Sequence, residues 1–185
     1  MSRKKQIATC PCCSTPRHGT EIKNCLSVLE KHERRLYRHY KELGIDSYQT
    51  LIHNDFEWAC DECIQNNKAI LANPALQESA WGVNLAYSDD QLTCRKCGTD
   101  FTFTKEEKRQ WYETYKFNLD SIPVNCFRCR KEIRQLKAEN KIISDILQKH
   151  ATDVTREEWL SVIDVYRKWD KPEKVKFYEA VLRKL

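Results

Sequence analysis

The chain has 185 residues, a length that fits one medium domain or two small ones. Only four residues are glycine, and neither G-x-G-x-x-G nor G-x-x-x-x-G-K-[ST] occurs, which excludes the nucleotide folds built on glycine-rich loops. The formal charge is +5, no apolar run approaches the roughly twenty residues of a membrane span, and no apolar segment follows the basic N-terminus, so neither a membrane helix nor a secretory signal is expected.

Ten cysteines are the unusual feature of the composition. A disulfide framework scatters its cysteines and belongs to exported proteins, whereas a C-x-x-C turn directs two thiolates at one tetrahedral ion. Two such turns complete a four-cysteine zinc site, so the sequence predicts two structural Zn²⁺ per chain. The predicted ligands are four C-x-x-C pairs, Cys10/Cys13, Cys60/Cys63, Cys94/Cys97 and Cys126/Cys129.

The four pairs can be combined in two ways. Sequential pairing joins the first pair with the second and the third with the fourth, and a cross-braced arrangement interleaves them. The segments 14–59 and 98–125 are each long enough to contain a helix, so sequential closure is sterically easy and is favoured. Cys12 and Cys25 lie outside the pairs, and Cys25 is expected to be a buried thiol.

The first long element expected in chain order is a helix over about residues 21–43. Its apolar residues recur at steps of three and four from Ile22 to Leu43, and Gly44 fits a helix stop. Basic side chains follow their own helical spacing on another side and predict a positive ridge. The ridge comprises Lys31, Arg34, Arg35, Arg38 and Lys41.

Residues 51–93 are acidic, with one Lys against seven Asp and Glu, and a helix is expected from about 61 to 72. Residues 91–104 alternate like a β-hairpin around the third C-x-x-C pair. Thr104 and Glu107 form a capping box that predicts a helix over about 105–117.

A long helix over about 128–150 is expected to begin at the last C-x-x-C pair. Its apolar stripe contains Asn140 and fits either a short coiled-coil seam or, as favoured by its length of three heptads, an amphipathic helix packed within the chain. A second basic row lies on this helix and consists of Arg130, Arg134, Lys137 and Lys141. The last segment predicts a helical hairpin that begins at a capping box of Thr155 and Glu158.

These elements predict an α-rich fold with small β-hairpins. Two four-cysteine zinc-knuckle modules, of zinc-ribbon or treble-clef type, are joined by helices and followed by a C-terminal helical hairpin. The expected divisions are 1–88, an N-terminal zinc module with an inserted basic helix; 89–150, a zinc-ribbon module with the long helix; and 151–185, the hairpin.

One part of the chain resembles a known family. The segment LTCRKCGTDFTFT at 92–104, the aromatic pair Trp111–Tyr112 and the segment CFRCRK at 126–131 resemble the bacterial "probable zinc-ribbon" domains over about residues 90–134. The resemblance implies Cys94, Cys97, Cys126 and Cys129 as zinc ligands, and it implies no activity.

The C-terminal hairpin is weakly similar to a single tetratricopeptide-type unit. Residues near the pattern positions are Trp159, Tyr166, Asp170, Lys174, Tyr178 and Ala180. Because such arrays usually need three or more units, we expect this hairpin to cap the fold or to bind a partner.

The expected function is binding rather than catalysis. A site closed by four thiolates keeps no open coordination position, and H-E-x-x-H is absent. We therefore expect a cytoplasmic zinc-binding adaptor that contacts DNA or RNA through its basic helices, with Trp58, Trp81 and Trp111 either stacking on bases or lying in the core. No membrane and no small-molecule substrate is expected.

Two alternatives stay open. A protein–protein scaffold or regulatory subunit without nucleic-acid contact explains the same sequence features through the C-terminal hairpin and the acidic middle segment. An HNH-like nuclease would need His18, or His53 with Asn54, as catalytic groups, and the Asp-His start expected of that motif is missing.

Overall fold

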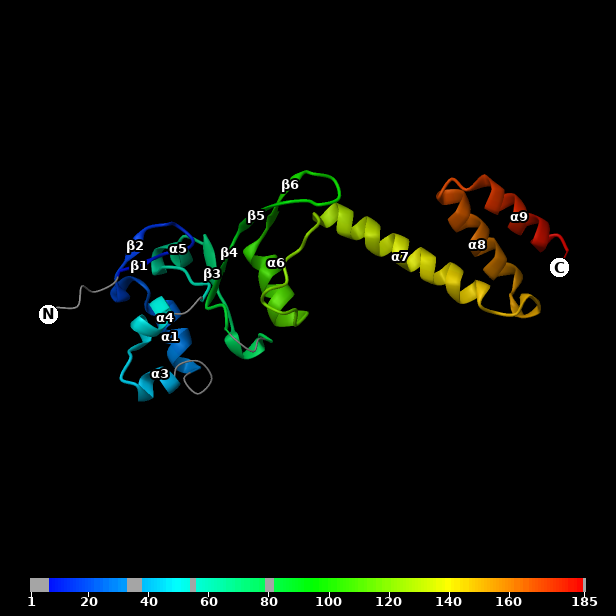
Figure 1. Cartoon of the computed structure of the whole chain (residues 1–185). Helices are drawn as coiled ribbons and strands as arrows, with labels where there is room; N and C mark the ends of the chain where they lie inside the picture. Colours follow the sequence, from blue (N-terminus) through cyan, green and yellow to red (C-terminus); the bar gives the residue numbers. More distant parts are fainter. Residues whose placement is uncertain (1–6, 33–37, 54–55, 79–81, 185) are drawn as a thin grey trace. The chain divides into compact units, whose positions relative to one another are not determined.

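The structure is a computed structural model that describes residues 7–32, 38–53, 56–78 and 82–184 (Figure 1). The chain forms two compact units, Met1–Val124 and Asn125–Leu185. The expected class is confirmed: the fold is rich in helices and contains small antiparallel hairpins. The three-module division made from the sequence motifs stays a prediction.

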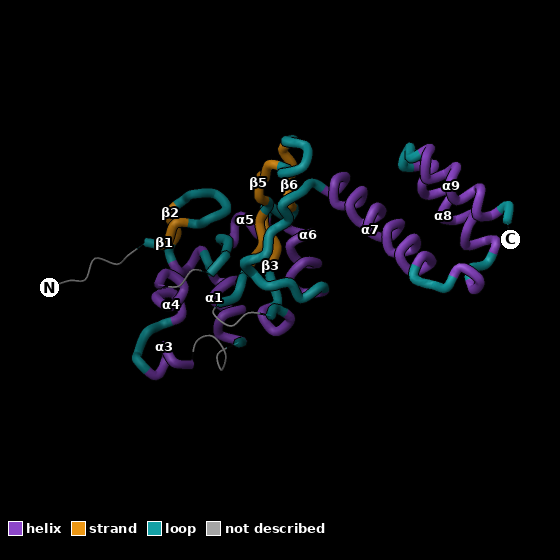
Figure 2. The backbone as a smooth tube through the Cα atoms, turned by 45° about the vertical axis from the view of Figure 1, so that its right-hand side comes forward, coloured by secondary structure: helices purple, strands orange, loops and turns teal. Residues whose placement is uncertain are grey.

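The described residues of the first unit form three two-stranded antiparallel sheets, coloured orange in Figure 2. The first pairs β1 (Ala8–Thr9) with β2 (Pro16–Arg17), and the second pairs β3 (Ala69–Leu71) with β4 (Ala86–Ser88). The third pairs β5 (Asp90–Thr93) with β6 (Asp100–Phe103), which confirms the hairpin expected at 91–104. The first and third hairpins each enclose a C-x-x-C pair.

The helices of the first unit are short. Among its described residues they are η1 (Gly19–Glu21), α1 (Lys23–Lys31), α3 (Arg38–Glu42), α4 (Ser47–His53), α5 (Asp61–Gln65), η2 (Pro74–Leu76) and α6 (Lys105–Arg109), which continues as the π-helix η3 (Gln110–Thr114). The side chain of Thr104 accepts a hydrogen bond from the Glu107 N–H and so caps α6, as its position in the sequence predicts.

The single helix predicted over 21–43 is wrong. The helix α1 ends at Lys31, with His32 as its C-cap at φ −100° and ψ 27°, and Arg38–Glu42 belongs to a second helix. A run of six charged or histidine residues at 30–35 offers no apolar side chain to bury, so packing does not extend the helix past the buried Leu29.

The helix predicted over 61–72 is also too long. Asn67 adopts a left-handed conformation at φ 53°, and the Lys68 N–H donates to the Cys63 carbonyl, which ends α5 after Gln65. The following residues pair with β4 instead, because Ile70 lies opposite Tyr87 and packs on the core around that ring. Tertiary pairing therefore overrides the local helical pattern.

Two apolar cores stabilise the first unit. The larger surrounds the first four cysteine ligands and includes Ile22, Leu29, Leu51 and Leu85, all of which are fully buried. The smaller core is aromatic, and in it Tyr87 stacks on Tyr112, with ring centroids 5.9 Å apart.

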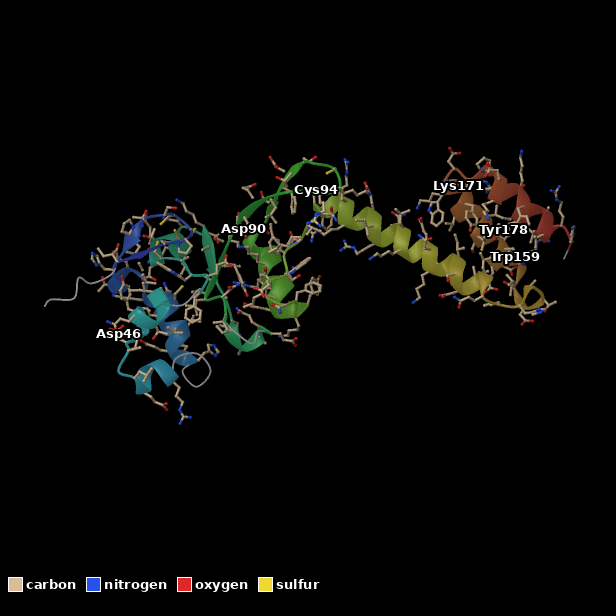
Figure 3. All side chains as sticks on the ribbon, viewed as in Figure 1. Asp46, Asp90, Cys94, Trp159, Lys171 and Tyr178 are labelled. Carbon is tan, nitrogen blue, oxygen red and sulfur yellow. The ribbon has the colours of Figure 1, made fainter. Side chains whose placement is uncertain are left out.

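A buried lysine links the segment that leads into the Cys60/Cys63 pair with the segment that leads into the Cys94/Cys97 pair. The side chain of Lys108 on α6 is 3% exposed, and its Nζ lies 2.7 Å from Glu57 Oε1 and 2.8 Å from Asp90 Oδ2. Glu57 precedes Cys60 by three residues, and Asp90 begins the strand β5 that leads to Cys94. Figure 3 labels Asp90 and Cys94 on this strand and the turn after it. This ion triad therefore ties the approach to one set of ligands to the approach to the other.

The second unit contains four helices within its described residues: α7 (Phe127–Leu147), η4 (Ala151–Asp153), α8 (Arg156–Lys168) and α9 (Pro172–Leu182). The expected long helix and helical hairpin are thus present, and the capping box of Thr155 and Glu158 forms as predicted. Trp159 stacks on Tyr178, with ring centroids 5.5 Å apart, and both are labelled in Figure 3. This stack forms the centre of the α8–α9 core.

None of the described helices is both long enough and apolar enough to cross a membrane.

Candidate metal centres

The eight paired cysteines form two groups of four. The first group is Cys10, Cys13, Cys60 and Cys63, and the second is Cys94, Cys97, Cys126 and Cys129. Within each group the four sulfur atoms lie within 4.8 Å of one another. The structure therefore shows the sequential pairing and not the cross-braced one.

The first two ligands of each group come from the same kind of turn. In the first group, the Ser14 N–H donates to the Cys10 carbonyl at 2.8 Å, and the Cys10 N–H donates to the Thr15 carbonyl at 2.9 Å. In the second group, Gly98 and Thr99 make the same two bonds with Cys94, at 2.8 and 2.9 Å. Each turn needs a residue with positive φ after its second cysteine, and Ser14 (56°) and Gly98 (71°) fill that position.

The last two ligands of each group lie at the start of a helix. Cys60 is the N-cap of α5 and Cys126 is the N-cap of α7, both in the extended conformation. Cys63 and Cys129 follow in the first turn of each helix, where a spacing of three places them on the same side as the cap. A knuckle turn followed by a helix N-terminus thus supplies the ligands in both groups.

The geometry and chemistry of both groups fit zinc. A tetrahedral ion with zinc–sulfur bonds of about 2.3 Å places its sulfur atoms about 3.8 Å apart. The Sγ atoms of Cys13 and Cys60 are 3.8 Å apart. Four thiolates are the donor set of structural zinc sites, so Cys10/Cys13/Cys60/Cys63 and Cys94/Cys97/Cys126/Cys129 would each hold one Zn²⁺, which confirms the two ions predicted.

Backbone and side-chain donors surround the first group. The Cys60 N–H donates to Cys10 Sγ at 3.3 Å, and Arg17 Nη2 donates to Cys13 Sγ at 3.8 Å. Burial acts to raise the pKa of the Cys13 thiol, but hydrogen bonds from Thr15 and Arg17 outweigh it and lower the pKa to about 6. These donors favour the thiolate that binds a metal ion.

Asp61 ties the helix between the two ligand pairs to the first metal centre. Its carboxylate accepts from the Lys23 N–H at 2.9 Å and from the Asn24 N–H at 3.0 Å, at the N-terminus of α1. Since Asp61 lies between Cys60 and Cys63, the segment inserted between the ligand pairs is fixed to the ligand turn itself. The sequence interpretation missed this contact, although the acidic pair inside the C-x-x-C spacing was visible.

The two remaining cysteines differ from the ligands. Cys25 is fully buried, its Sγ lies 3.3 Å from the Ala59 carbonyl, and burial raises the pKa of its thiol to about 12. It is therefore a protonated core residue. Cys12 is half-buried beside the first core.

The tryptophans expected either to stack on bases or to lie in the core have different environments. Trp58 is buried in the larger core, which leaves its ring unable to stack on a base. Trp111 is half-buried against Phe103 and Phe117, with ring centroids 5.7 and 4.6 Å away. Trp81 lies outside the described residues.

The two basic rows also differ. Lys31, Arg38 and Lys41 are exposed on two separate helices, α1 and α3, and Arg34 and Arg35 lie outside the described residues. Arg130, Arg134, Lys137 and Lys141 all lie on the continuous helix α7.

The groups of possible metal ligands found among the described residues contain cysteines and no histidine. His18 is exposed at the N-cap of η1, and the side chain of His53 and the whole of Asn54 lie outside the description.

Comparison with known protein families gives a match of residues 88–138 to the family described as a probable treble clef domain. This match confirms the zinc-domain resemblance predicted for about residues 90–134. It covers less than half of the chain and so characterises this segment alone. The comparisons with curated proteins and with solved structures give no match. The similarity of the hairpin to a tetratricopeptide unit stays a prediction.

Proposed function

We propose that this zinc-binding protein is a non-catalytic adaptor that binds the phosphate backbone of nucleic acid through one face of α7. The basic face of α7 consists of Arg130, Arg134, Lys137 and Lys141. Steps of four, three and four residues keep these side chains on one side of a helix. At about 1.5 Å per residue they span roughly 16 Å, or about five 3.4 Å steps along one strand of B-DNA.

Three of the four cations of this face are available for binding, and Arg130 is half-buried. Arg134, Lys137 and Lys141 are exposed, and none forms a salt bridge within the described part of the chain. Two other cations of the second unit are neutralised, since Lys168 pairs with Glu139 and Lys149 pairs with Glu158. Lysine and arginine without acidic partners are the groups that displace counterions from phosphates.

The opposite side of α7 packs on the hairpin, and this leaves the basic face outward. Ile143 and Ile146 are buried, and Glu139 accepts hydrogen bonds from Lys168 and Trp169 of α8 and its C-cap. With about 100° of rotation per residue, positions 139, 143 and 146 lie about 180° from the basic face. The single observation that carries the proposal is the separation, on one helix, of three exposed cations without salt bridges to other described residues (Arg134, Lys137 and Lys141) from a packed face.

The zinc ions have a structural role in this proposal. Four thiolates close the coordination sphere, so each ion would fix a ligand turn to the start of a helix without activating water. At the second group, Cys126 and Cys129 hold the first turn of the helix that carries the basic face.

A salt titration tests the proposal. Replacing Arg134, Lys137 and Lys141 with Gln should make the dependence of the binding constant on salt less steep. For a 20-base-pair DNA, the negative slope of log K against log salt should shrink in magnitude by about 2.7, which is about 0.9 for each lost phosphate contact. Single-stranded DNA and duplex RNA of the same length identify the preferred nucleic acid. The matched control replaces three exposed lysines of the hairpin, Lys171, Lys174 and Lys176, with Gln and should leave the slope unchanged.

The alternative is a protein scaffold, and exposed apolar side chains on the hairpin favour it. Leu160 on α8 and Phe177 on α9 are exposed although both are large and apolar. If the zinc-loaded protein binds none of the three nucleic acids at low salt, or if both triple variants change the slope equally, the basic-face proposal is wrong and the scaffold role is favoured.

A further inference from the structure

Arg17 is a charged side chain that contacts a ligand of the first metal centre without being a ligand itself. It ends strand β2, four residues after Cys13, and its side chain is 14% exposed. Its guanidinium contacts three groups. Nη1 donates to Glu21 Oε1 at 3.0 Å, and Nη2 donates to Glu62 Oε2 at 2.5 Å and to Cys13 Sγ at 3.8 Å.

These partners come from both halves of the centre. Glu21 lies in η1, on the segment that follows the Cys10–Cys13 turn, and Glu62 lies inside the Cys60–Cys63 pair. Arg17 therefore joins the two pairs of ligands by a path that does not pass through the metal ion. A guanidinium presents several donors in one plane, which suits it to hold three acceptors at once.

A cavity of about 230 Å³ opens beside these groups. Its lining includes the ligands Cys13 and Cys63 together with Arg17 and Glu62. Water or a chelator that attacks the first centre from this cavity would meet the Arg17–Glu62 ion pair next to the two sulfur atoms.

We propose that Arg17 is a positioning residue of the first zinc centre and slows the release of its metal ion. The hydrogen bond to Cys13 Sγ orients a ligand and offsets part of the negative charge that four thiolates give to the centre. The bonds to Glu21 and Glu62 fix the guanidinium in place. This inference is independent of the nucleic-acid proposal, because it concerns the retention of metal alone.

The second centre provides an internal comparison. Its knuckle turn has the same backbone bonds, but the residue four positions after Cys97 is Phe101, which has no charge. A substitution at Arg17 should therefore change metal release at one centre only. A substitution that merely weakened the fold would change release at both.

The test measures release from each centre separately. The protein is loaded with ¹¹³Cd²⁺, which gives one NMR signal for each four-cysteine centre, and the first centre is the signal lost in Cys10→Ser. EDTA is then added and both signals are followed. Losing an outer partner of a metal ligand usually lowers metal affinity about 10- to 100-fold, so if binding keeps its rate we expect release from the first centre of Arg17→Met to be faster by about the same factor. Release from the second centre should change less than twofold.

Three further variants complete the test. Arg17→Lys keeps the charge but loses the planar donor set, so its release rate should lie between wild type and Arg17→Met. Glu62→Gln removes a charged partner of Arg17 and should also accelerate metal release from the first centre, but less than Arg17→Met does. The control Arg38→Met removes an exposed arginine that pairs with Glu42 and should change neither centre.

Two results with Arg17→Met would overturn the proposal. One is an unchanged release rate at the first centre in Arg17→Met. The other is an equal acceleration at both centres. If Arg17→Met does not bind two ions, then Arg17→Lys and Glu62→Gln decide the question, and wild-type release in both also overturns the proposal.

Discussion

Removing Lys108 should destabilise the first unit strongly, because its ammonium group lies between two carboxylates in a buried position. Glu57 Oε1 and Asp90 Oδ2 are 2.7 and 2.8 Å from Lys108 Nζ, so they lie at most about 5.5 Å from each other. In Lys108→Met the cation is lost and the carboxylates face one another. At an effective dielectric constant of about 20 their repulsion is about 3 kcal/mol.

The exposure of Glu57 and Asp90 decides how much stability Lys108→Met loses within the range known for broken buried ion pairs. Breaking a buried ion pair by removing one partner costs about 3–5 kcal/mol. The side chains of Glu57 and Asp90 are 27% and 45% exposed, so water screens them in part. We therefore expect the lower end, about 3 kcal/mol, which corresponds to a fall of roughly 10 °C in Tm for a unit of this size.

Urea unfolding of the zinc-loaded protein, followed by circular dichroism, measures this loss. The loss should also depend on pH. Burial raises the pKa of Glu57, and removing Lys108 removes the group that opposes this shift. A folded-state pKa above the unfolded value means that stability falls as pH rises through it. The deficit of Lys108→Met should therefore be smaller at pH 5.5 than at pH 7.5.

A charge-matched variant provides the control. Adding Glu57→Gln and Asp90→Asn to Lys108→Met removes the repulsion at nearly constant volume, so the triple variant should recover most of the lost stability. The reasoning is refuted if Lys108→Met costs less than about 1 kcal/mol, or if the triple variant is no more stable than the single one.

Three other predictions concern the caps, turns and ions. Thr155→Ala removes the N-cap of α8 and should cost about 1 kcal/mol in urea unfolding, with Thr155→Ser close to wild type. Gly98→Ala places a side chain at φ 71° and should weaken zinc binding by about 1 kcal/mol. Ser14→Gly, at φ 56°, should strengthen zinc binding at its turn by a similar amount. Competition with a chelator measures both affinities. On EDTA treatment the second centre should lose its ion first, because its ligand Cys97 is exposed, and equal ¹¹³Cd NMR decay at both centres would contradict this order.

The metal ligands were predictable from the sequence because their geometry is local. Two cysteines three residues apart fix a turn by themselves, and four such pairs leave few arrangements. The capping residues Thr104 and Thr155 were predictable for the same reason.

The features that depend on contacts between distant residues were not predictable. Arg17 meets Glu62 across 45 positions, and Lys108 meets Glu57 across 51. A lysine in a sequence is expected at the surface, since burial requires partners that only the fold supplies. The end of α1 at Lys31 likewise depends on a tertiary contact, since Leu29 is the last residue of the helix buried in the larger core.

The position of Cys126 at the start of α7 has an electrostatic consequence. A centre of four thiolates and one divalent cation carries about −2 charges, and it lies at the positive end of the peptide dipoles of a 21-residue helix. Hydrogen bonds from α8 and its C-cap reach α7 at Glu139, in the second half of the helix, so we expect the earlier turns to depend more on this anchoring charge. Removing the zinc ion would then be expected to loosen the first turns of α7 before the turns that pack on the hairpin.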